Sequence, residues 1–246
     1  HANRQVSSVE QAITSEIWDQ CQGELSDWGE AVYVGGGIDL GGRDDLAAYG
    51  LCAKLPDSIE TVAEDDGNEV ERTIWRYEVR SKAYIEADCD RDLDQQPWVS
   101  WLYEGHLTQS ETLIPDLRDS FVESMQEYGG ESVAFDPYNA RQVGQELEAE
   151  GLTAVKMPQS YGHFNEPLRE FLKALKENRV THNGDPVLGW AALNMSIKQG
   201  TRAEWMPAKD HSKEKIDPIV AVVMAFRECY FADTESGWSL RDGAVW

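Results

Sequence analysis

Three aspartates stand at the ends of apolar stretches, where a folded chain can hold a carboxylate rigidly. Asp39 ends the run 33–38 and is followed by a glycine turn, Asp136 ends a short apolar run, and Asp217 opens the apolar run 219–226. Mg²⁺ and Mn²⁺ prefer hard oxygen ligands, which clustered aspartates supply. If the first two stretches are neighbouring strands and the third is a helix packed on their sheet, the three carboxylates converge into a divalent-metal site.

A simpler role competes for the same residues. Asp136, Asp185 and Asp217 are each followed by proline, and an Asp N-cap with Pro at the first helical position is a common helix start. The Asp-Pro pair alone therefore does not indicate chemistry. Asp136 differs by the buried strand predicted before it, and Asp217 by the apolar helix that it opens. Asp39 has its own simpler alternative, which is to bond the turn that follows it.

Other recognisable active sites are missing from the sequence. It contains no Gly-x-Ser-x-Gly elbow and no phosphate-binding P-loop, and none of its five histidines pairs with Ser or Cys in a known nucleophile motif. The alternating aspartates at 88–94 lack the glycine and closing glutamate of a calcium loop. The natural candidates for phosphate contacts are the basic residues Lys173, Lys176, Arg179, Lys209, His211, Lys213 and Lys215.

Hydrophobic periodicity predicts the elements that must position these acids. A hairpin at 31–56 and a third strand at 70–79 form an antiparallel meander, with the acidic stretch 56–68 as a solvated loop. Helices and strands then alternate, as helix 115–128, strand 131–136, helix 138–150, strand 152–157 and helices 164–178, 186–197 and 218–231. A meander followed by right-handed βαβ crossovers gives an α/β fold, in which a mixed sheet carries helices on both faces.

Length and composition set the outer bounds. The 246 residues fit one large domain or two small ones, and we predict a helical lead-in or linker at 1–30 and a folded domain at 31–246. No apolar run approaches a membrane span, and no signal peptide is visible. The cysteines are far apart and form no Cys-x-x-Cys pair, which is typical of reduced thiols in a cytoplasmic protein; they are Cys21, Cys52, Cys89 and Cys229.

The charge balance is strongly acidic. The chain carries 22 basic and 45 acidic residues, for a net charge of -23. Such a charge argues against a protein whose main task is to grip a phosphate backbone. It does not exclude a nuclease whose site is balanced locally by metal ions.

Short segments in a fixed order carry a resemblance to a known family. They are Gly-Ile-Asp-Leu at 37–40, Phe-Asp-Pro-Tyr-Asn-Ala at 135–140, Val-Lys-Met-Pro-Gln at 155–159, Thr-His-Asn-Gly-Asp-Pro-Val-Leu at 181–188 and Lys-Glu-Lys-Ile-Asp-Pro-Ile-Val-Ala at 213–221. From about residue 8 to about residue 228 the chain resembles the C-terminal nuclease domain of the large terminase subunit of tailed bacteriophages. The three glycines before Ile38 and the strong acidity depart from that family's pattern.

The resemblance implies a fold and an activity. The family's domain is ribonuclease-H-like, with the first strand central and the strand ending in Asp136 beside it. It cuts concatemeric double-stranded viral DNA during capsid filling, with Mg²⁺ or Mn²⁺ held by acids. The resemblance identifies these catalytic and metal-binding acids as Asp39, Asp136 and Asp217. Asp39 is expected to bridge two ions, in the manner of two-metal sites whose ions lie about 3.5–4 Å apart.

The resemblance also implies partners and further positions. The expected partners are double-stranded DNA, the terminase ATPase domain that this chain lacks, the small terminase subunit and the portal, in the cytoplasm of an infected bacterium. Asp45 falls on another acidic family position, and His182 and Asn194 match recurrent ones. Lys209 or a neighbour is placed to offset transition-state charge.

Two alternatives from other functional classes remain open at this point. The glycine-flanked Asp39 is similar to the phosphate hairpin of actin-like sugar kinases and ATPases, although Arg43 and Asp44 stand where that class has Thr or Ser. A non-catalytic acidic binding protein is the other. Metal-dependent DNA cleavage by the purified chain separates the nuclease from both.

Overall fold

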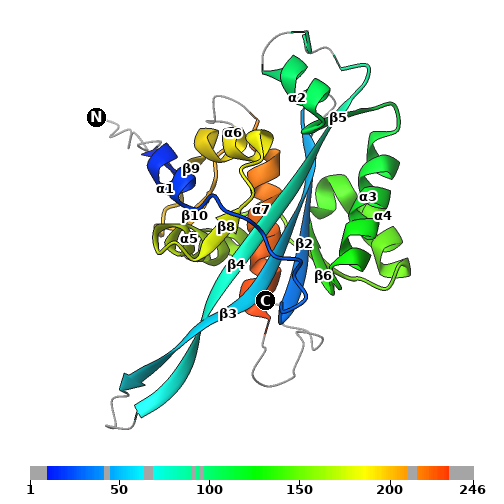
Figure 1. Cartoon of the computed structure of the whole chain (residues 1–246). Coiled ribbons are helices and arrows are strands. Elements are labelled where there is room, and N and C mark those ends of the chain that lie inside the picture. Colours follow the sequence, from blue (N-terminus) through cyan, green and yellow to red (C-terminus); the bar gives the residue numbers. More distant parts are fainter. Residues whose placement is uncertain are drawn as a thin grey trace.

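The computed structural model describes residues 10–41, 45–63, 69–89, 92–94, 97–209 and 215–232. Within them the central sheet has the strand order β5-β4-β3-β2-β6-β7, with β8 beside β4 (Figure 1). Its strands are β2 Tyr33–Leu40, β3 Ala47–Ala63, β4 Glu69–Glu86, β5 Leu107–Ser110, β6 Ser132–Phe135, β7 Thr153–Lys156 and β8 Val180–His182.

The sheet is mixed in direction. The neighbours β2, β3 and β4 run antiparallel, whereas β6 lies parallel to β2, and β7 parallel to β6. The predicted meander followed by βαβ units is therefore confirmed. It leaves β2 in the middle of the sheet, between β3 and β6.

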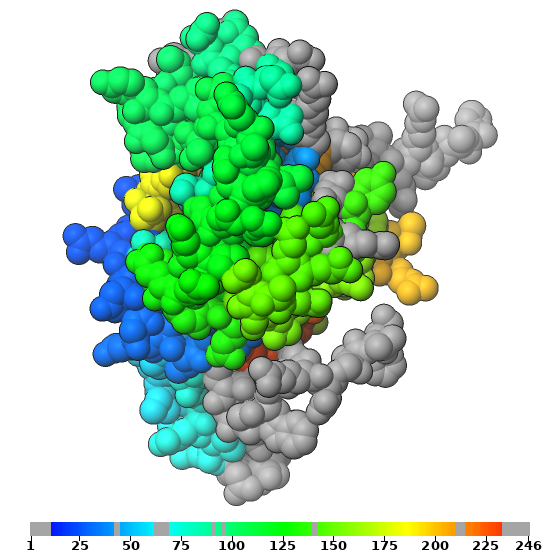
Figure 2. Space-filling view, turned by 90° about the vertical axis from the view of Figure 1, so that its right-hand side faces the viewer, coloured from blue at the N-terminus to red at the C-terminus, as the bar shows by residue number. Residues whose placement is uncertain are grey.

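Helices cover both faces, as predicted. One face carries α1 Ser15–Gln20, α5 Tyr161–Lys176, α6 Pro186–Asn194 and the buried α7 Asp217–Phe231, and the other carries α3 Leu113–Glu127 and α4 Pro137–Ala149. Figure 2 looks onto this second face, where α3 and α4 cover the middle of the molecule. The helix α2 Trp98–Glu104 packs beside β5 in a separate aromatic cluster.

Glycines of β2 and β3 lie where helices press on the sheet. Gly37 of β2 and Gly50 of β3 face α7, and a Cβ on Gly50 would stand 2.6 Å from the backbone nitrogen of Val222. Gly36 faces the other way, where a Cβ would stand 2.4 Å from the ring of Phe121 on α3. Only residues without a side chain let both helix layers approach β2 this closely.

The hairpin β3–β4 is longer than predicted. Residues 57–63, which were expected in a solvated loop, continue β3 and pair with β4 past an irregularity between Pro56 and Ser58; residues 64–68 lie outside the described part of the chain. The sequence Ser-Ile-Glu-Thr-Val at 58–62 contains three β-branched residues, which favour strand despite the flanking acids. The paired strands project from the body of the molecule as a two-stranded arm (Figure 1).

The lead-in is less helical than predicted. Of the described residues before β2, only 15–20 form a helix, and β1 Glu10–Gln11 pairs with β9 Ser196–Gln199 in a small second sheet. This sheet also contains β10 Trp205–Pro207. The helix predicted at 186–197 ends at Asn194, so that β9 can form. The boundary between a lead-in at 1–30 and a domain at 31–246 stays a prediction.

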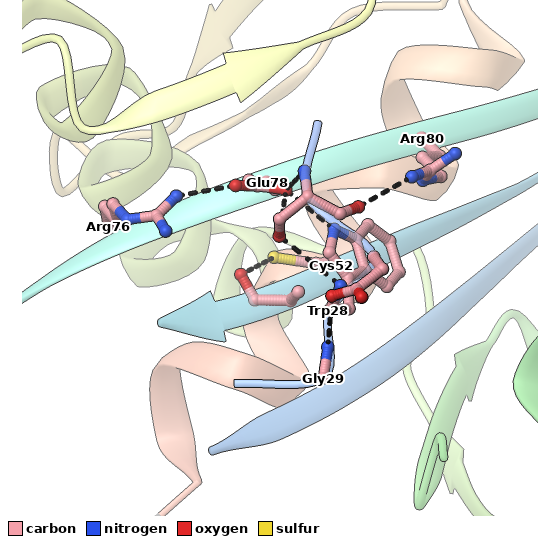
Figure 3. Close-up of polar contacts among 9 residues, drawn as sticks. Trp28, Gly29, Cys52, Arg76, Glu78 and Arg80 are labelled. Atoms are coloured by element: carbon pink, nitrogen blue, oxygen red, sulfur yellow. Dashed lines mark hydrogen bonds and ion pairs between the residues drawn. The ribbon is translucent and has the colours of Figure 1, made fainter. Parts of the chain in front are cut away.

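Glu78 on β4 anchors the segment that leads into β2 (Figure 3). Its Oε2 accepts hydrogen bonds from the backbone and hydroxyl of Ser26 at 2.8 and 2.9 Å and from the indole of Trp28 at 2.9 Å, while Arg76 pairs with Oε1 at 2.6 Å. Burial alone would raise the pKa of Glu78, but these donors together hold it below its ordinary value. Trp28 has a φ of 63°, so the contacts hold a backbone conformation that large residues rarely adopt.

Two expectations about the chain's environment can be compared with the structure. All four cysteines are free, and Cys21, Cys52 and Cys229 are buried, in agreement with reduced thiols. Among the described helices, none combines the length and the apolar character needed to cross a bilayer.

Candidate metal centre

Asp39 and Asp136 lie at neighbouring strand ends of the central sheet. Ile38 of β2 and Phe135 of β6 are register partners on adjacent parallel strands, so the next residue on each strand is one of the predicted aspartates. Asp39 is completely buried, and Asp136 is only 8% exposed. Ile38 and Phe135 pack in the layer of α3 and α4. Because side chains alternate along a strand, Asp39 points to the opposite face, where α7 lies.

The third acid comes from the start of α7. Asp217 is the first residue of this helix and is 3% exposed. The close contact of α7 with the glycines of β2 and β3 brings its N-terminus to the same edge of the sheet. The positive end of the helix dipole favours a carboxylate there.

Lys209 lies between Asp39 and Asp217. Its Nζ is 2.6 Å from Asp39 Oδ2 and 2.8 Å from Asp217 Oδ1. The Asp217 contact is a hydrogen bond that the ammonium donates. The Asp39 contact is a close ion pair to a completely buried carboxylate. One cation thus draws together acids that lie far apart in the sequence.

The electrostatics of the cluster are dominated by burial. Burial raises the pKa of Asp39 to about 7, Lys209 opposes this rise, and the negative charges of Asp217 and Asp136 add to it. Asp136 thus acts on Asp39 through its charge, in agreement with the adjacent strand ends that carry the two residues. Burial alone would lower the pKa of Lys209, but attraction to Asp39 and Asp217 outweighs it and raises that pKa above its usual value.

Gln159 is a residue of this site that the sequence did not identify as functional. Its side-chain amide donates to Asp39 Oδ1 at 3.0 Å. Gln159 lies just after β7, which is parallel to β6 and ends at the same edge of the sheet. The sequence feature that could have identified Gln159 is its polar side chain shortly after a strand that ends at the same edge of the sheet. The bond orients the carboxylate of Asp39 and leaves Oδ2 directed to the cation.

The three Asp-Pro pairs divide into different roles. Asp136 and Asp185 are N-caps, of α4 and α6, accepting from Tyr138 N at 3.0 Å and from Leu188 N at 2.8 Å. Asp217 is not a cap, because Ile216 holds that position and α7 has no side-chain cap hydrogen bond. The capping interpretation is therefore wrong for Asp217, whose carboxylate bonds Lys209 instead.

Both carboxylate oxygens of Asp185 have structural partners. One carboxylate oxygen caps α6, and the other lies 3.2 Å from His106 Nδ1. It belongs to the packing of α6, as its weaker sequence context had indicated. Asp136 differs because its neighbours include Asp39.

His182 has a structural role. It is buried, its ring stacks on Trp18 with centroids 4.0 Å apart, and its Nδ1 accepts from Gly184 N at 3.1 Å. Nε2 therefore carries the proton and donates to the Trp18 carbonyl at 2.9 Å. Burial lowers the pKa of His182. The residue joins α1 to β8.

The other candidate positions lie around the cluster or away from it. Asp45 forms an ion pair with Lys215. Asn194 donates to the Trp190 carbonyl at 2.8 Å within α6, so its contact is local. His211 and Lys213 are outside the described residues, while Lys173 and Lys176 belong to the last turn of α5, away from the acids.

The acids of this cluster are of the chemical type that hard divalent cations prefer. Carboxylate oxygens are the usual ligands of Mg²⁺ and Mn²⁺, and the three carboxylates are buried. Within the ranges that the structure describes, no three His, Cys, Asp or Glu side chains are gathered so that they could hold a metal ion. The ammonium of Lys209 lies between two of the carboxylates.

Fold and acids together define a ribonuclease-H-like domain with an acidic cluster at the end of its central strand. Residues 84–233, more than half of the chain, match the family model described as terminase large subunit, endonuclease domain. The chain belongs to this family. The expected likeness to terminase nuclease domains is thereby confirmed, and membership argues against the sugar-kinase alternative.

Individual relatives agree with this assignment. The chain is 26% identical to the terminase large subunit of Enterobacteria phage HK97 over 248 residues, which cover 98% of this chain and 45% of that protein. It is 24% identical to protein YmfN of Escherichia coli K12 over 196 residues, covering 75% of this chain and 43% of YmfN. It thus spans less than half the length of either relative.

A solved structure supports the fold. The crystal structure of the HK97 bacteriophage large terminase superimposes with a TM-score of 0.70 at 22% identity, covering 89% of this chain and 44% of that one. The ribonuclease-H-like fold implied by the sequence resemblance is confirmed by this likeness.

Proposed function

We propose that this chain is a divalent-metal-dependent endonuclease that cuts double-stranded viral DNA during genome packaging. The observation that carries the proposal is the gathering of buried carboxylates at the end of the central strand, where Asp39 and Asp217 share one ammonium and Asp136 follows the neighbouring strand. Burying such groups together is costly, and Asp185, by contrast, has no second carboxylate among its partners in the described part of the chain.

The carboxylates are suited to hold Mg²⁺ or Mn²⁺. Asp39, Asp136 and Asp217 are the residues that would hold the metal. When bound, such ions lower the pKa of water to generate a nucleophile and stabilise the attacking and leaving oxygens of a phosphodiester displacement.

The surrounding residues have supporting roles. Gln159 holds Asp39 Oδ1 and so fixes the direction of its second oxygen. The Pro-initiated helices α4 and α7 fix the backbone of Asp136 and Asp217, because proline sets the first helical φ angle. Lys209 supplies a positive charge beside the acids, where a phosphate must approach against a net charge of -23.

Little sequence preference is expected. No base-reading motif occurs in the sequence, and the proposed contacts are made to phosphate, which carries no sequence information directly. By analogy with the family, the ATPase domain, the small terminase subunit and the portal are the proposed partners, in the cytoplasm of an infected bacterium.

Incubating the purified chain with supercoiled plasmid tests the proposal. We expect nicking and linearisation with Mn²⁺ or Mg²⁺ and none in excess chelator. Cleavage that persists in chelator, or that occurs at one defined sequence, would contradict it.

A further inference from the structure

We propose that Lys209 is an internal cation that occupies the acidic cluster until a divalent metal ion displaces it. The inference rests on the proposed function, since it concerns the same carboxylates. It assigns to Lys209 a positioning role in the metal-free protein, in addition to the charge that it offers to phosphate.

The atoms contacted by Lys209 are those that a metal ion needs. Its Nζ lies 2.6 Å from Asp39 Oδ2 and 2.8 Å from Asp217 Oδ1. Lys209 is the partner that the described residues give to the first oxygen, because Gln159 bonds the other oxygen of Asp39. An ammonium and a metal ion cannot both neutralise the same buried oxygens at contact distance. The two cations therefore compete.

The metal-free cluster needs such a cation. Asp39, Asp136 and Asp217 are 0%, 8% and 3% exposed, and buried carboxylates that share a site repel one another. Gln159 is neutral and bonds only Oδ1 of Asp39. Lys209 is the cation that contacts two of the acids, so it holds the α7 N-terminus against the end of β2.

The surroundings of Lys209 allow its side chain to move away from the acids. Its side chain is 34% exposed, and it follows β10 in the connection to α7 rather than lying in a helix or strand. The preceding Ala208 is buried, and its N–H donates to the Ser196 carbonyl at 2.8 Å. The main chain is thus fixed beside a long, flexible side chain, which lets the ammonium swing out while its backbone stays in place.

Lys209→Met tests this, because methionine keeps an unbranched apolar stem and removes the charge. By calorimetry without DNA, we expect Mn²⁺ to bind the variant up to about fivefold more tightly, the factor for losing one partly exposed ion pair. In chelator the variant should melt below the parent. Lys209→Arg should retain the parent's behaviour in both measurements.

A measurement on the parent protein covers the case in which the variant does not fold. Amine acetylation read by mass spectrometry should label Lys209 several-fold faster with Mn²⁺ than in chelator, while the exposed Lys176 at the far end of α5 serves as internal control. Unchanged labelling of Lys209 despite measurable Mn²⁺ binding would overturn the inference and leave the nuclease intact. Failure of parent and variant alike to bind Mn²⁺ would instead overturn the proposed metal centre.

Discussion

Gly37 lies directly beneath Ala221: a Cβ on residue 37 would stand 2.1 Å from the Ala221 carbonyl oxygen and 2.6 Å from the backbone nitrogen of Ala225. This contact sets the distance between β2 and α7. Asp39 follows Gly37 by two residues, and Asp217 precedes Ala221 by one helical turn. The glycine therefore determines whether the two carboxylates can share a cation.

Gly37→Ala should consequently destabilise the fold strongly. The added methyl group meets backbone rather than a mobile side chain, so we expect a loss of about 3 kcal/mol or more, at the upper end of overpacking effects. For a chain of this size that lowers the melting temperature by roughly 6–12 °C. Circular dichroism melts in chelator measure it.

Gly162→Ala is the matched control for that substitution. Gly162 lies in the first turn of α5, and a Cβ there would meet nothing within 4 Å. Alanine is the better helix former, so we expect unchanged or slightly raised stability, by about 0.5 kcal/mol. Equal losses at both positions would show that α7 does not press on Gly37.

The aspartate series separates caps from metal ligands. Asn caps a helix about as well as Asp but is neutral and offers one oxygen where a carboxylate offers two. Asp136→Asn and Asp217→Asn should therefore reduce plasmid cleavage by more than about 100-fold, while Asp185→Asn keeps it.

Thermal melts check that the inactive variants are folded. Since clustered carboxylates repel one another, Asp136→Asn should melt no lower than the parent in chelator. Asp217→Asn loses the ion pair with Lys209, so it should melt below the parent while still unfolding in one cooperative transition. Both variants should also lose the stabilisation by Mn²⁺, which for the parent is about 2.7 kcal/mol when the free ion is at 100 times its Kd. Normal cutting by all three variants would place the active site elsewhere.

Glu78→Gln should loosen the segment before β2. The glutamine cannot pair with Arg76 and leaves charge-assisted donors unmatched, so we expect a loss of about 2–4 kcal/mol at pH 7. Glu148→Gln, at an exposed position on α4, should change stability by less than about 0.5 kcal/mol.

The stability lost in Glu78→Gln should depend on pH in a defined direction. Its donors hold the pKa of Glu78 below its ordinary value, so its contribution is present above the unfolded-state pKa of about 4.3. It disappears as pH falls through the lower folded-state pKa. The difference between parent and Glu78→Gln in urea unfolding should shrink below about pH 4. A constant difference down to pH 3 would contradict this account.

DNA binding should be weak and sensitive to salt. A net charge of -23 repels the duplex, so binding depends on a few local cations, each phosphate contact adding about 0.9 to the slope of log affinity against log salt. Lys156 is exposed and pairs in register with Phe135, beside Asp136. In Ca²⁺, Lys156→Gln should lower the slope by about 0.9.

Lys176→Gln provides the comparison for that slope. Lys176 lies at the far end of α5, about 24 Å along the helix from its start near Gln159. Its substitution should leave the slope unchanged. Tight binding that ignores salt would show that this view of the surface is wrong.

The sequence by itself determined the order of the main elements and the acids at their ends. Alternation and helical periodicity are local properties, so β2, β6 and α7 could be predicted with Asp39, Asp136 and Asp217 at their boundaries. That the strand ending in Asp136 lies beside the first strand was an expectation from the family resemblance, and the parallel pairing of β2 with β6 confirms it. Local signals failed where strands depend on distant partners, as in β8, β9 and the outer part of β3.

Only the tertiary structure decided which Asp-Pro pair does more than cap a helix. Asp185 and Asp217 share the Asp-Pro pair typical of a helix start, yet one bonds its own helix and His106 while the other contacts Lys209. Gln159 likewise contacts Asp39 across 120 positions in the sequence. Such contacts depend on how closely α7 and β7 approach β2, which glycine packing and strand pairing set together. A carboxylate's role is fixed by the charges that surround it after folding, and these come from segments that local periodicity does not connect.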